Sequence, residues 1–285
     1  MGPGCVRSIP RRKKFANDVG SAICFLKFCL QKDHVSMSPL ITSLLSWLCF
    51  PLYVVQGIYV RKTSMRLSPA PGPRTGQFGK GKAETVLLTI GDSSAAAVGI
   101  DDTSGAIGPQ MAHKLFEMHG RPVAWHISGH NSAVAGEIRD QVVPNLAERD
   151  YTHIIIMLGT NDMKNWHSVK RWKKEFGTLL YALRTRFPEA KLYWHQAIDV
   201  RHAPALPEPL GSILNLRVKL LNRKGAQLCL ERGAVCVPPL PVVDPAGYCR
   251  DGFHANEAGY NAWADHMIAH LDRQPRTSPA VAEFL

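Results

Sequence analysis

The sequence lacks the residue patterns that hold a metal ion in hydrolases. Its 12 histidines are scattered along the chain, and no two of them enclose a glutamate at the spacing of a zinc-binding helix. The seven cysteines are odd in number, show no zinc-site spacing and imply no disulfide framework. We therefore expect no metal ion, and no motif in the chain calls for an organic cofactor.

Acidic residues are also scarce, but only in the first part of the chain. Residues 1–82 contain 13 of the 34 Lys and Arg residues and only 2 of the 23 Asp and Glu residues. The remaining residues contain 21 of each sign, so the formal net charge of +11 belongs to the N-terminal region. A neutral globular part argues against binding to nucleic acid. Basic charge near an N-terminus more naturally faces anionic lipid, so we expect a membrane partner and no nucleic-acid partner.

Charged residues are absent from residues 39–60, which are mostly apolar. A helix of this length, at about 1.5 Å per residue, would cross a hydrocarbon core about 30 Å thick. Arg61 and Lys62 follow directly, in place of the small residues of a signal-peptide cleavage site. The sequence predicts a single-pass transmembrane helix over residues 39–60 that anchors the protein, with a buried helix of a soluble protein as the alternative. The side of the membrane is left open, because basic residues flank both ends.

Composition divides the rest of the chain. Residues 1–38 are a basic N-terminal extension without a recognisable fold, and Met37 is an alternative start. Residues 61–83 are rich in Pro, Gly and Ser and are predicted to be a linker. We expect one globular domain over residues 84–273, followed by a C-terminal tail over residues 274–285.

Strand and helix patterns alternate within this domain. Short apolar runs that predict strands cover residues 85–90, 122–127, 154–158, 191–198 and 234–237. Apolar residues at helical spacing cover residues 109–119, 169–187, 214–231 and 260–271. This alternation is typical of a parallel sheet with helices on both faces, here with five strands.

Small or polar residues directly follow the first three predicted strands. They are Ser93, in the segment Gly91-Asp92-Ser93-Ser94, then Gly129, then Asn161. Ligands of open α/β sheets bind beyond the carboxyl ends of the strands. There a serine can attack a substrate, a glycine N–H can approach an oxygen closely, and an asparagine carboxamide can donate to an oxyanion. Taken singly, each segment is also a common turn or helix cap, and Ser94 is a competing nucleophile.

A fourth segment supplies an acid–base pair. Asp251 and His254 stand three residues apart, before the last predicted helix. A turn at this spacing can place the carboxylate against Nδ1 of the imidazole and leave Nε2 to take a proton from Ser93. Because a serine nucleophile needs a base, the pair turns four weak motifs into one predicted site of acyl hydrolysis. Asp162 is interpreted as a structural residue.

These residues resemble the SGNH branch of the GDSL esterase/lipase family, in which Ser, Gly, Asn and His lie in four separate blocks. The similarity covers residues 85–272, and residues 205–210 and 251–260 are similar to a bacterial, membrane-anchored subgroup. The resemblance implies a three-layer α/β/α flavodoxin-like fold, with Ser93 as nucleophile, His254 as base and Asp251 as its partner. It also implies an oxyanion hole made by the N–H groups of Ser93 and Gly129 and by Asn161 Nδ2.

The sequence thus predicts a serine esterase or lipase that cleaves carboxylic esters or thioesters through an acyl-serine intermediate. The alternative is a non-catalytic ligand-binding module whose residues 91–93 hold an anion, although anion binding does not require the Asp251 and His254 pair. The acyl and alcohol specificity and the oligomeric state are open. Trp166, Arg201 and His202 follow the third and fourth strands and either line the substrate site or belong to plain surface loops.

Overall fold

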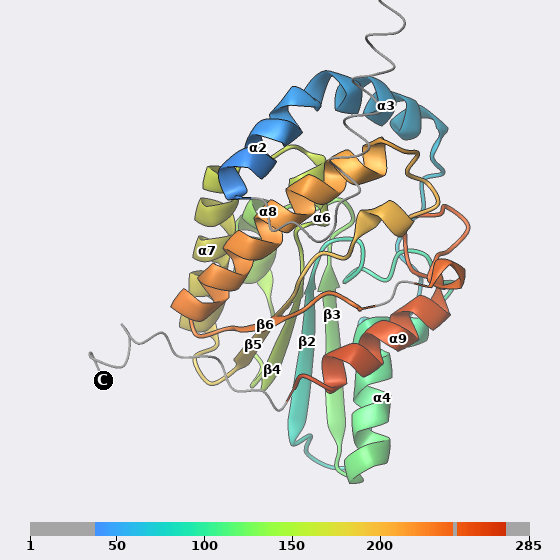
Figure 1. Cartoon of the computed structure of the whole chain (residues 1–285). Helices are drawn as coiled ribbons and strands as arrows, with labels where there is room; N and C mark the ends of the chain where they lie inside the picture. The colour runs from blue at the N-terminus through green and yellow to red at the C-terminus, as the bar shows by residue number, and fades with distance from the viewer. Residues whose placement is uncertain (1–37, 242–243, 272–285) are drawn as a thin grey trace, which may run out of the picture.

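A computed structural model describes residues 38–241 and 244–271 of the chain. The predicted tail over residues 274–285 and nearly all of the predicted extension over residues 1–38 lie outside the described residues. A six-stranded sheet with the strand order β1-β3-β2-β4-β5-β6 lies at the centre (Figure 1). The strands are β1 Thr75–Phe78, β2 Thr85–Gly91, β3 Val123–Gly129, β4 His153–Met157, β5 Lys191–His195 and β6 Val235–Val237.

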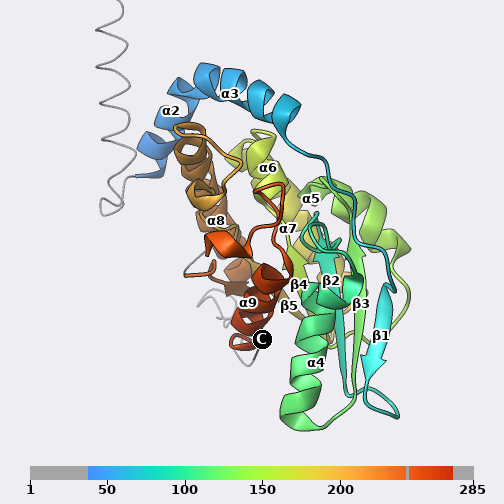
Figure 2. The same ribbon diagram turned by 90° about the vertical axis from the view of Figure 1, so that its right-hand side faces the viewer.

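The five predicted strands are present and parallel, but the sheet is mixed because β1 pairs with β3 in the antiparallel direction. The prediction of a purely parallel, five-stranded sheet is therefore corrected. The additional strand, β1, lies at one edge of the sheet and belongs to the segment that was predicted to be a linker (Figure 2). The sequence of β1, TGQF, contains a single large apolar residue, so it has no hydrophobic pattern that would predict a strand. Gly76 lets it lie close to Trp125, since a Cβ at Gly76 would stand 2.5 Å from the indole ring.

Helices cover both faces of the sheet (Figure 1). Helices α7 and α8 pack together on one face, and α4 and α9 pack together on the other. The longer helices are α2 Pro39–Leu48, α3 Phe50–Thr63, α4 Ile107–His119, α7 Val169–Arg186, α8 Leu210–Glu231 and α9 Glu257–Ile268. The short helical segments are Thr103–Gly105, α5 Ala135–Glu137, Ile138–Val142, Val143–Asn145, α6 Thr160–Lys164, Val200–His202 and Pro245–Gly247.

The central strands are buried on both sides, which explains their continuous apolar sequence. In β4, Ile154 and Ile156 contribute to the core beneath α7 and α8, whereas Ile155 contributes to the core beneath α4 and α9. All three side chains are fully buried. Successive residues of a strand point to opposite faces, so one apolar run serves both cores.

Residues 39–60 do not form one continuous helix. Helix α2 ends at Leu48, α3 begins at Phe50, and the two are bent by 61°. Pro51 stands in the first turn of α3, where it is tolerated, but it cannot continue the hydrogen bonding of α2. In the described part of the chain no single helix has the length and hydropathy to cross a membrane, although the bent pair passes that test as a unit. The predicted continuous helix is thus corrected to two shorter ones, and the membrane anchor stays a prediction.

Helices α2 and α3 pack against α8, and their aromatic side chains contact Trp166 in the loop between α6 and α7. The rings of Trp47, Phe50 and Tyr53 lie 5.9, 5.2 and 4.4 Å from the ring of Trp166, between centroids. The Tyr53 hydroxyl also donates a hydrogen bond to the Lys164 carbonyl. Since aromatic contacts of this kind stabilise a core, both helices belong to the folded body that contains the sheet.

Candidate active site

A tight turn after β2 presents Ser93. Gly91 ends the strand with a φ of +149°, and a Cβ there would stand 2.0 Å from the Met157 carbonyl oxygen, so only glycine fits. The Asp92 N–H donates to that carbonyl over 2.9 Å, and the Asp92 carboxylate accepts the Ser94 N–H over 3.0 Å. These contacts fix the turn at the carboxyl end of the sheet, where Ser93 is largely buried.

Ser93 meets the predicted acid–base pair, 161 residues later in the chain. Nε2 of His254 lies 3.0 Å from the Ser93 hydroxyl oxygen, and Nδ1 of His254 lies 2.6 Å from Oδ2 of Asp251. An ionised Asp251 accepts the Nδ1–H, which leaves Nε2 as the acceptor for the serine proton. The structure therefore brings the three predicted residues into one continuous hydrogen-bonded chain, and His254 contacts Ser93 and not Ser94.

The turn that contains Asp251 keeps its carboxylate ionised. Oδ1 accepts the N–H groups of Phe253 and His254 over 2.8 and 2.9 Å and the Cys249 thiol over 3.1 Å. Burial alone would raise the pKa of Asp251, but the hydrogen bond to the His254 ring and the further donors lower it well below its usual range. Cys249 was not predicted as a site residue, because its contact depends on the fold of the turn.

Asn161 stands in the first turn of α6, directly after β4. It is 3% exposed, and one N–H of its carboxamide donates to the Ala133 carbonyl over 3.1 Å. That bond fixes the side chain and leaves the second N–H of the carboxamide for another acceptor. Asn161 and His254 line the same cavity, as expected for residues that act on one substrate.

Gly129 ends β3 beside Gly91, with which it pairs. A Cβ at this position would stand 2.1 Å from the Ala96 nitrogen, so the turn after Ser93 requires a glycine here for close packing. Gly129 does not line either of the two cavities beside Ser93 and His254. Its predicted role as an N–H donor stays a prediction, whereas its packing role is visible.

Two cavities meet at His254, and Ser93 lines the first of them. The first, about 230 Å³, runs toward the ends of β5 and β6 and is largely apolar, with Ile198, Leu240 and Trp263 in its wall. The second, about 930 Å³, extends beneath α3, and its lining includes Tyr53, Ile58, Leu206, Asn161 and His254. The candidate base therefore borders both cavities, which together offer space for the two halves of an ester.

Two cavity residues escaped prediction. Ser132 lines the larger cavity with a φ of +67°, a left-handed conformation that is uncommon outside glycine and that no sequence pattern marks. His195 lines the smaller cavity at the end of β5, a position that the strand-end argument could have identified. The Trp263 indole donates to Nε2 of His195 over 2.7 Å, and burial lowers the pKa of His195 to about 3. His195 is therefore neutral with Nε2 occupied, which leaves His254 as the available base.

The three residues considered for the substrate site line neither cavity. Trp166 packs against α2 and α3, as described above. Arg201 forms an ion pair with Asp199 over 2.5 Å. His202 lies at the end of the short helix after β5.

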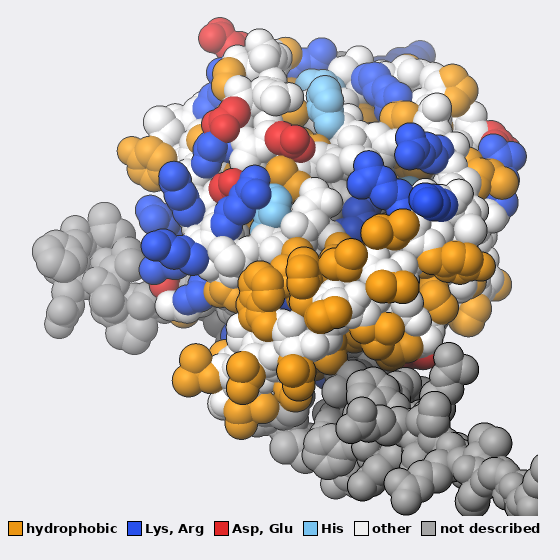
Figure 3. Space-filling model, turned by 90° about the horizontal axis from the view of Figure 1, so that it is seen from above, with side chains coloured by type: hydrophobic (Ala, Val, Ile, Leu, Met, Phe, Trp, Pro, Cys, Tyr) orange, Lys and Arg blue, Asp and Glu red, His pale blue; other side chains and the backbone are white. Residues whose placement is uncertain are grey.

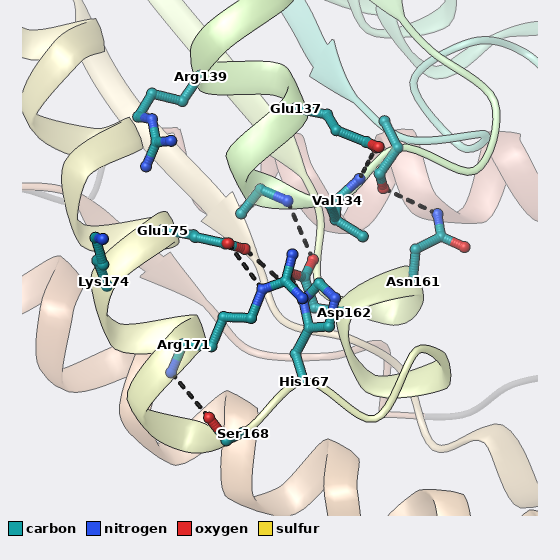
Figure 4. Close-up of polar contacts among 12 residues, drawn as sticks. Val134, Glu137, Arg139, Asn161, Asp162, His167, Ser168, Arg171, Lys174 and Glu175 are labelled. Atoms are coloured by element: carbon teal, nitrogen blue, oxygen red, sulfur yellow. Dashed lines mark hydrogen bonds and ion pairs between the residues drawn. The ribbon is translucent and has the colours of Figure 1, made fainter.

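A second Asp–His pair, Asp162 with His167, lies beside Asn161 (Figure 4). Nδ1 of His167 is 3.0 Å from Oδ1 of Asp162 and 3.7 Å from Oε2 of Glu175. Asp162 Oδ2 accepts the Ala135 N–H over 3.3 Å, and Glu175 Oε1 accepts Arg171 Nε over 2.8 Å. By residue type the two carboxylates and the imidazole could hold a cation. Their present contacts form a polar network that holds the start of α5, which is what a structural role for Asp162 would require.

Comparisons with known proteins identify the family of the chain and proteins of similar fold. A family model described as GDSL-like lipase/acylhydrolase matches residues 89–262. No curated protein sequence matches the chain. Among solved structures, TesA is similar with 18% identity and a TM-score of 0.54 over 66% of this chain and 98% of that one. The psychrotrophic esterase EstA from Pseudoalteromonas sp. is similar with 17% identity and a TM-score of 0.52 over 65% of this chain and 96% of that one. At these identities the likeness concerns the fold.

Proposed function

Since the chain belongs to the GDSL-like lipase/acylhydrolase family, we propose that it cleaves carboxylic esters or thioesters through an acyl-Ser93 intermediate. The observation that carries this proposal is the chain of contacts from Ser93 Oγ through His254 to Asp251, at 3.0 and 2.6 Å. A module that only bound an anion would need neither the imidazole nor its orienting carboxylate.

In the first half of the reaction Ser93 Oγ attacks the carbonyl carbon while its proton passes to His254 Nε2. Asp251 stabilises the imidazolium that forms. The carbonyl oxygen becomes an oxyanion, to which the free N–H of Asn161 and the N–H groups of Ser93 and Gly129 are proposed to donate. When the tetrahedral intermediate collapses, His254 returns the proton to the leaving alcohol or thiol.

In the second half a water molecule attacks the acyl-serine carbonyl. His254 takes a proton from this water and then returns it to Ser93 Oγ, so the carboxylic acid leaves and the enzyme is restored. The two cavities that meet at His254 suit this sequence of steps, because the acyl group stays bound while the alcohol is exchanged for water.

Removal of the nucleophile tests the proposal most directly. We expect Ser93→Ala to lower kcat for p-nitrophenyl acetate on the order of 10⁴- to 10⁶-fold and to abolish labelling by a fluorophosphonate. The matched control is Ser94→Ala, since Ser94 is the adjacent hydroxyl and does not contact His254. Wild-type turnover and labelling in Ser93→Ala would overturn the proposal, and selective loss in Ser94→Ala would move the nucleophile by one residue.

A further inference from the structure

The outer side of α2 and α3 exposes a row of large apolar side chains. Leu40, Leu44 and Leu48 recur at every fourth residue and are 83%, 72% and 69% exposed. Val55 and Tyr59 extend the row along α3 and are 68% and 64% exposed. Figure 3 shows this face, on which hydrophobic side chains gather with Lys and Arg side chains beside them. We refer to these five residues as the outer apolar face.

The outer apolar face is not explained by the packing of the domain. The opposite sides of α2 and α3 already contact α8 and Trp166, as described above. Soluble monomers rarely leave a contiguous row of this kind in water, so the face is expected to bind something.

The charges around the face indicate an anionic partner. Residues 38–83 contain six Lys and Arg residues and no Asp or Glu. Arg61, Lys62 and Arg66 follow the apolar part of α3 and are exposed, and none of them forms an ion pair with another described residue. Apolar side chains bordered by unopposed basic residues match the surface of a bilayer that contains anionic lipid.

The lengths of the helices suit a position in the plane of the membrane. At about 1.5 Å per residue, neither α2, with 10 residues, nor α3, with 14, reaches the roughly 30 Å of a hydrocarbon core. The inner side of α3 is also occupied, because Tyr53, Gly57 and Val60 line the larger cavity. A helix with one apolar side in lipid and the other against a protein cavity is typical of an interfacial helix.

The larger cavity connects this helix to the proposed base, His254, which contacts Ser93. Val54 and Ile58 line the cavity and are also 37% and 52% exposed, so they stand at its rim beside the outer apolar face. Asn161 and His254 line the same cavity at the catalytic centre. An ester that enters past α3 therefore reaches the hydrogen-bonded chain of Ser93 without leaving the neighbourhood of the membrane surface.

We propose that the outer apolar face binds the surface of an anionic bilayer, with α2 and α3 in the membrane plane, and that the cavity beneath α3 admits a long-chain lipid ester from this surface. The substrate part of the proposal rests on the proposed ester hydrolysis, whereas the binding of the bilayer does not.

Vesicle binding of the full chain tests the surface. We expect affinity for phosphatidylcholine vesicles with about 30% phosphatidylglycerol to exceed affinity for pure phosphatidylcholine by at least about tenfold. The variant Leu40→Ser/Leu44→Ser/Leu48→Ser/Val55→Ser should lose at least about tenfold in affinity for the anionic vesicles. The matched control is Met118→Ser/Tyr181→Ser, which removes two equally exposed apolar side chains, 62% and 61%, from α4 and α7. It should bind as the wild type does.

Activity measurements separate the two proposals. The quadruple variant should hydrolyse p-nitrophenyl acetate in solution at the wild-type rate but should cleave a long-chain ester embedded in anionic vesicles at least about tenfold more slowly. Normal vesicle binding without any ester hydrolysis would refute the proposed function and leave the membrane surface standing.

Three outcomes would overturn the membrane surface. The first is a wild type that does not bind anionic vesicles. The second is equal vesicle binding by the wild type and the quadruple variant, which would place the attachment elsewhere in the chain, such as in residues 1–37. The third is a wild-type dimer that the quadruple variant converts to a monomer without vesicle binding, which would make the face an interface between copies.

Discussion

Asp251 with His254 and Asp162 with His167 are two Asp–His pairs of similar geometry that differ in their surroundings. The carboxylate meets Nδ1 over 2.6 Å in the first pair and over 3.0 Å in the second. The ring of His254 is 19% exposed and presents Nε2 to Ser93, whereas that of His167 is 6% exposed and lies near a second carboxylate. An Asp–His contact thus becomes a candidate base only where the far nitrogen reaches a nucleophile beside a cavity.

The pKa values of the two carboxylates are also shifted in opposite directions. Despite its burial, Asp251 has a pKa below its usual range because it accepts from the His254 ring and from several further donors. Asp162 has fewer donors, so desolvation raises its pKa. The first carboxylate is held as an anion that orients an imidazole. The second accepts the N–H of Ala135, at the start of α5, and acts as a structural clamp.

Replacement of each carboxylate by a carboxamide should reveal the largest difference between the two pairs. Asp251→Asn should lower kcat for p-nitrophenyl acetate by about 10⁴-fold, because a carboxamide holds the wrong tautomer of His254 and does not stabilise its imidazolium. Asp162→Asn should change kcat by less than about tenfold but should destabilise the protein by about 1–3 kcal/mol, because one donor of the clamp loses its acceptor.

Steady-state kinetics and urea unfolding of both variants measure these effects. Each variant serves as the isosteric control for the other. Equal losses of activity at unchanged stability would show that the two pairs do not differ in function, and the distinction drawn from their exposure would be wrong.

A smaller effect is expected at Asn161, which precedes Asp162 in the chain and lines the same cavity as His254. Asn161→Ala should lower kcat about 10²- to 10³-fold, because an oxyanion donor is lost. The proposed role predicts that KM changes little, since the donor acts on charge that develops in the transition state. Asn161→Asp, which keeps the size but removes the carboxamide donors, should be similarly slow. An active Asp variant would show that catalysis needs neither an oxyanion donor at Asn161 nor its hydrogen bond to the Ala133 carbonyl.

The parts of this site that could be predicted are those encoded locally. Asp251 and His254 are close in sequence, and Ser93 and Asn161 follow strands whose apolar runs are unmistakable. The carboxyl ends of parallel strands meet at one edge, so the sheet assembles these residues. The family resemblance and the α/β fold, which rest on the same strands and motifs, are confirmed.

The features that escaped prediction depend on contacts between distant segments. Strand β1 has no hydrophobic pattern and exists only because β3 supplies its hydrogen bonds. The bend between α2 and α3 accompanies their packing on Trp166, more than a hundred residues later. The φ of Ser132 likewise follows from the path of a loop and not from its composition.

A third buried carboxylate, Asp92, extends the comparison to the stability of the fold. It is 3% exposed and has no histidine partner within hydrogen-bond distance, and burial raises its pKa from 3.8 to about 6. Between these two values the folded state binds more protons than the unfolded state, so the free energy of unfolding falls as the pH rises. The full contribution is present below about pH 4, and about 3 kcal/mol of it is lost as the pH passes 6.

Urea unfolding of the wild type and of Asp92→Asn between about pH 4 and pH 8 measures this contribution. The difference between the two proteins should shift by about 3 kcal/mol in favour of the variant as the pH rises. For Asp251→Asn the difference in the free energy of unfolding should change in the opposite direction. The lowered pKa of Asp251 stabilises the folded wild type at pH values above the ordinary pKa of an aspartate, and this stability is lost as the pH falls. Parallel curves for the wild type and Asp92→Asn would mean that Asp92 is solvated in the folded state. The turn that presents Ser93 would then be more open than its hydrogen bonds indicate.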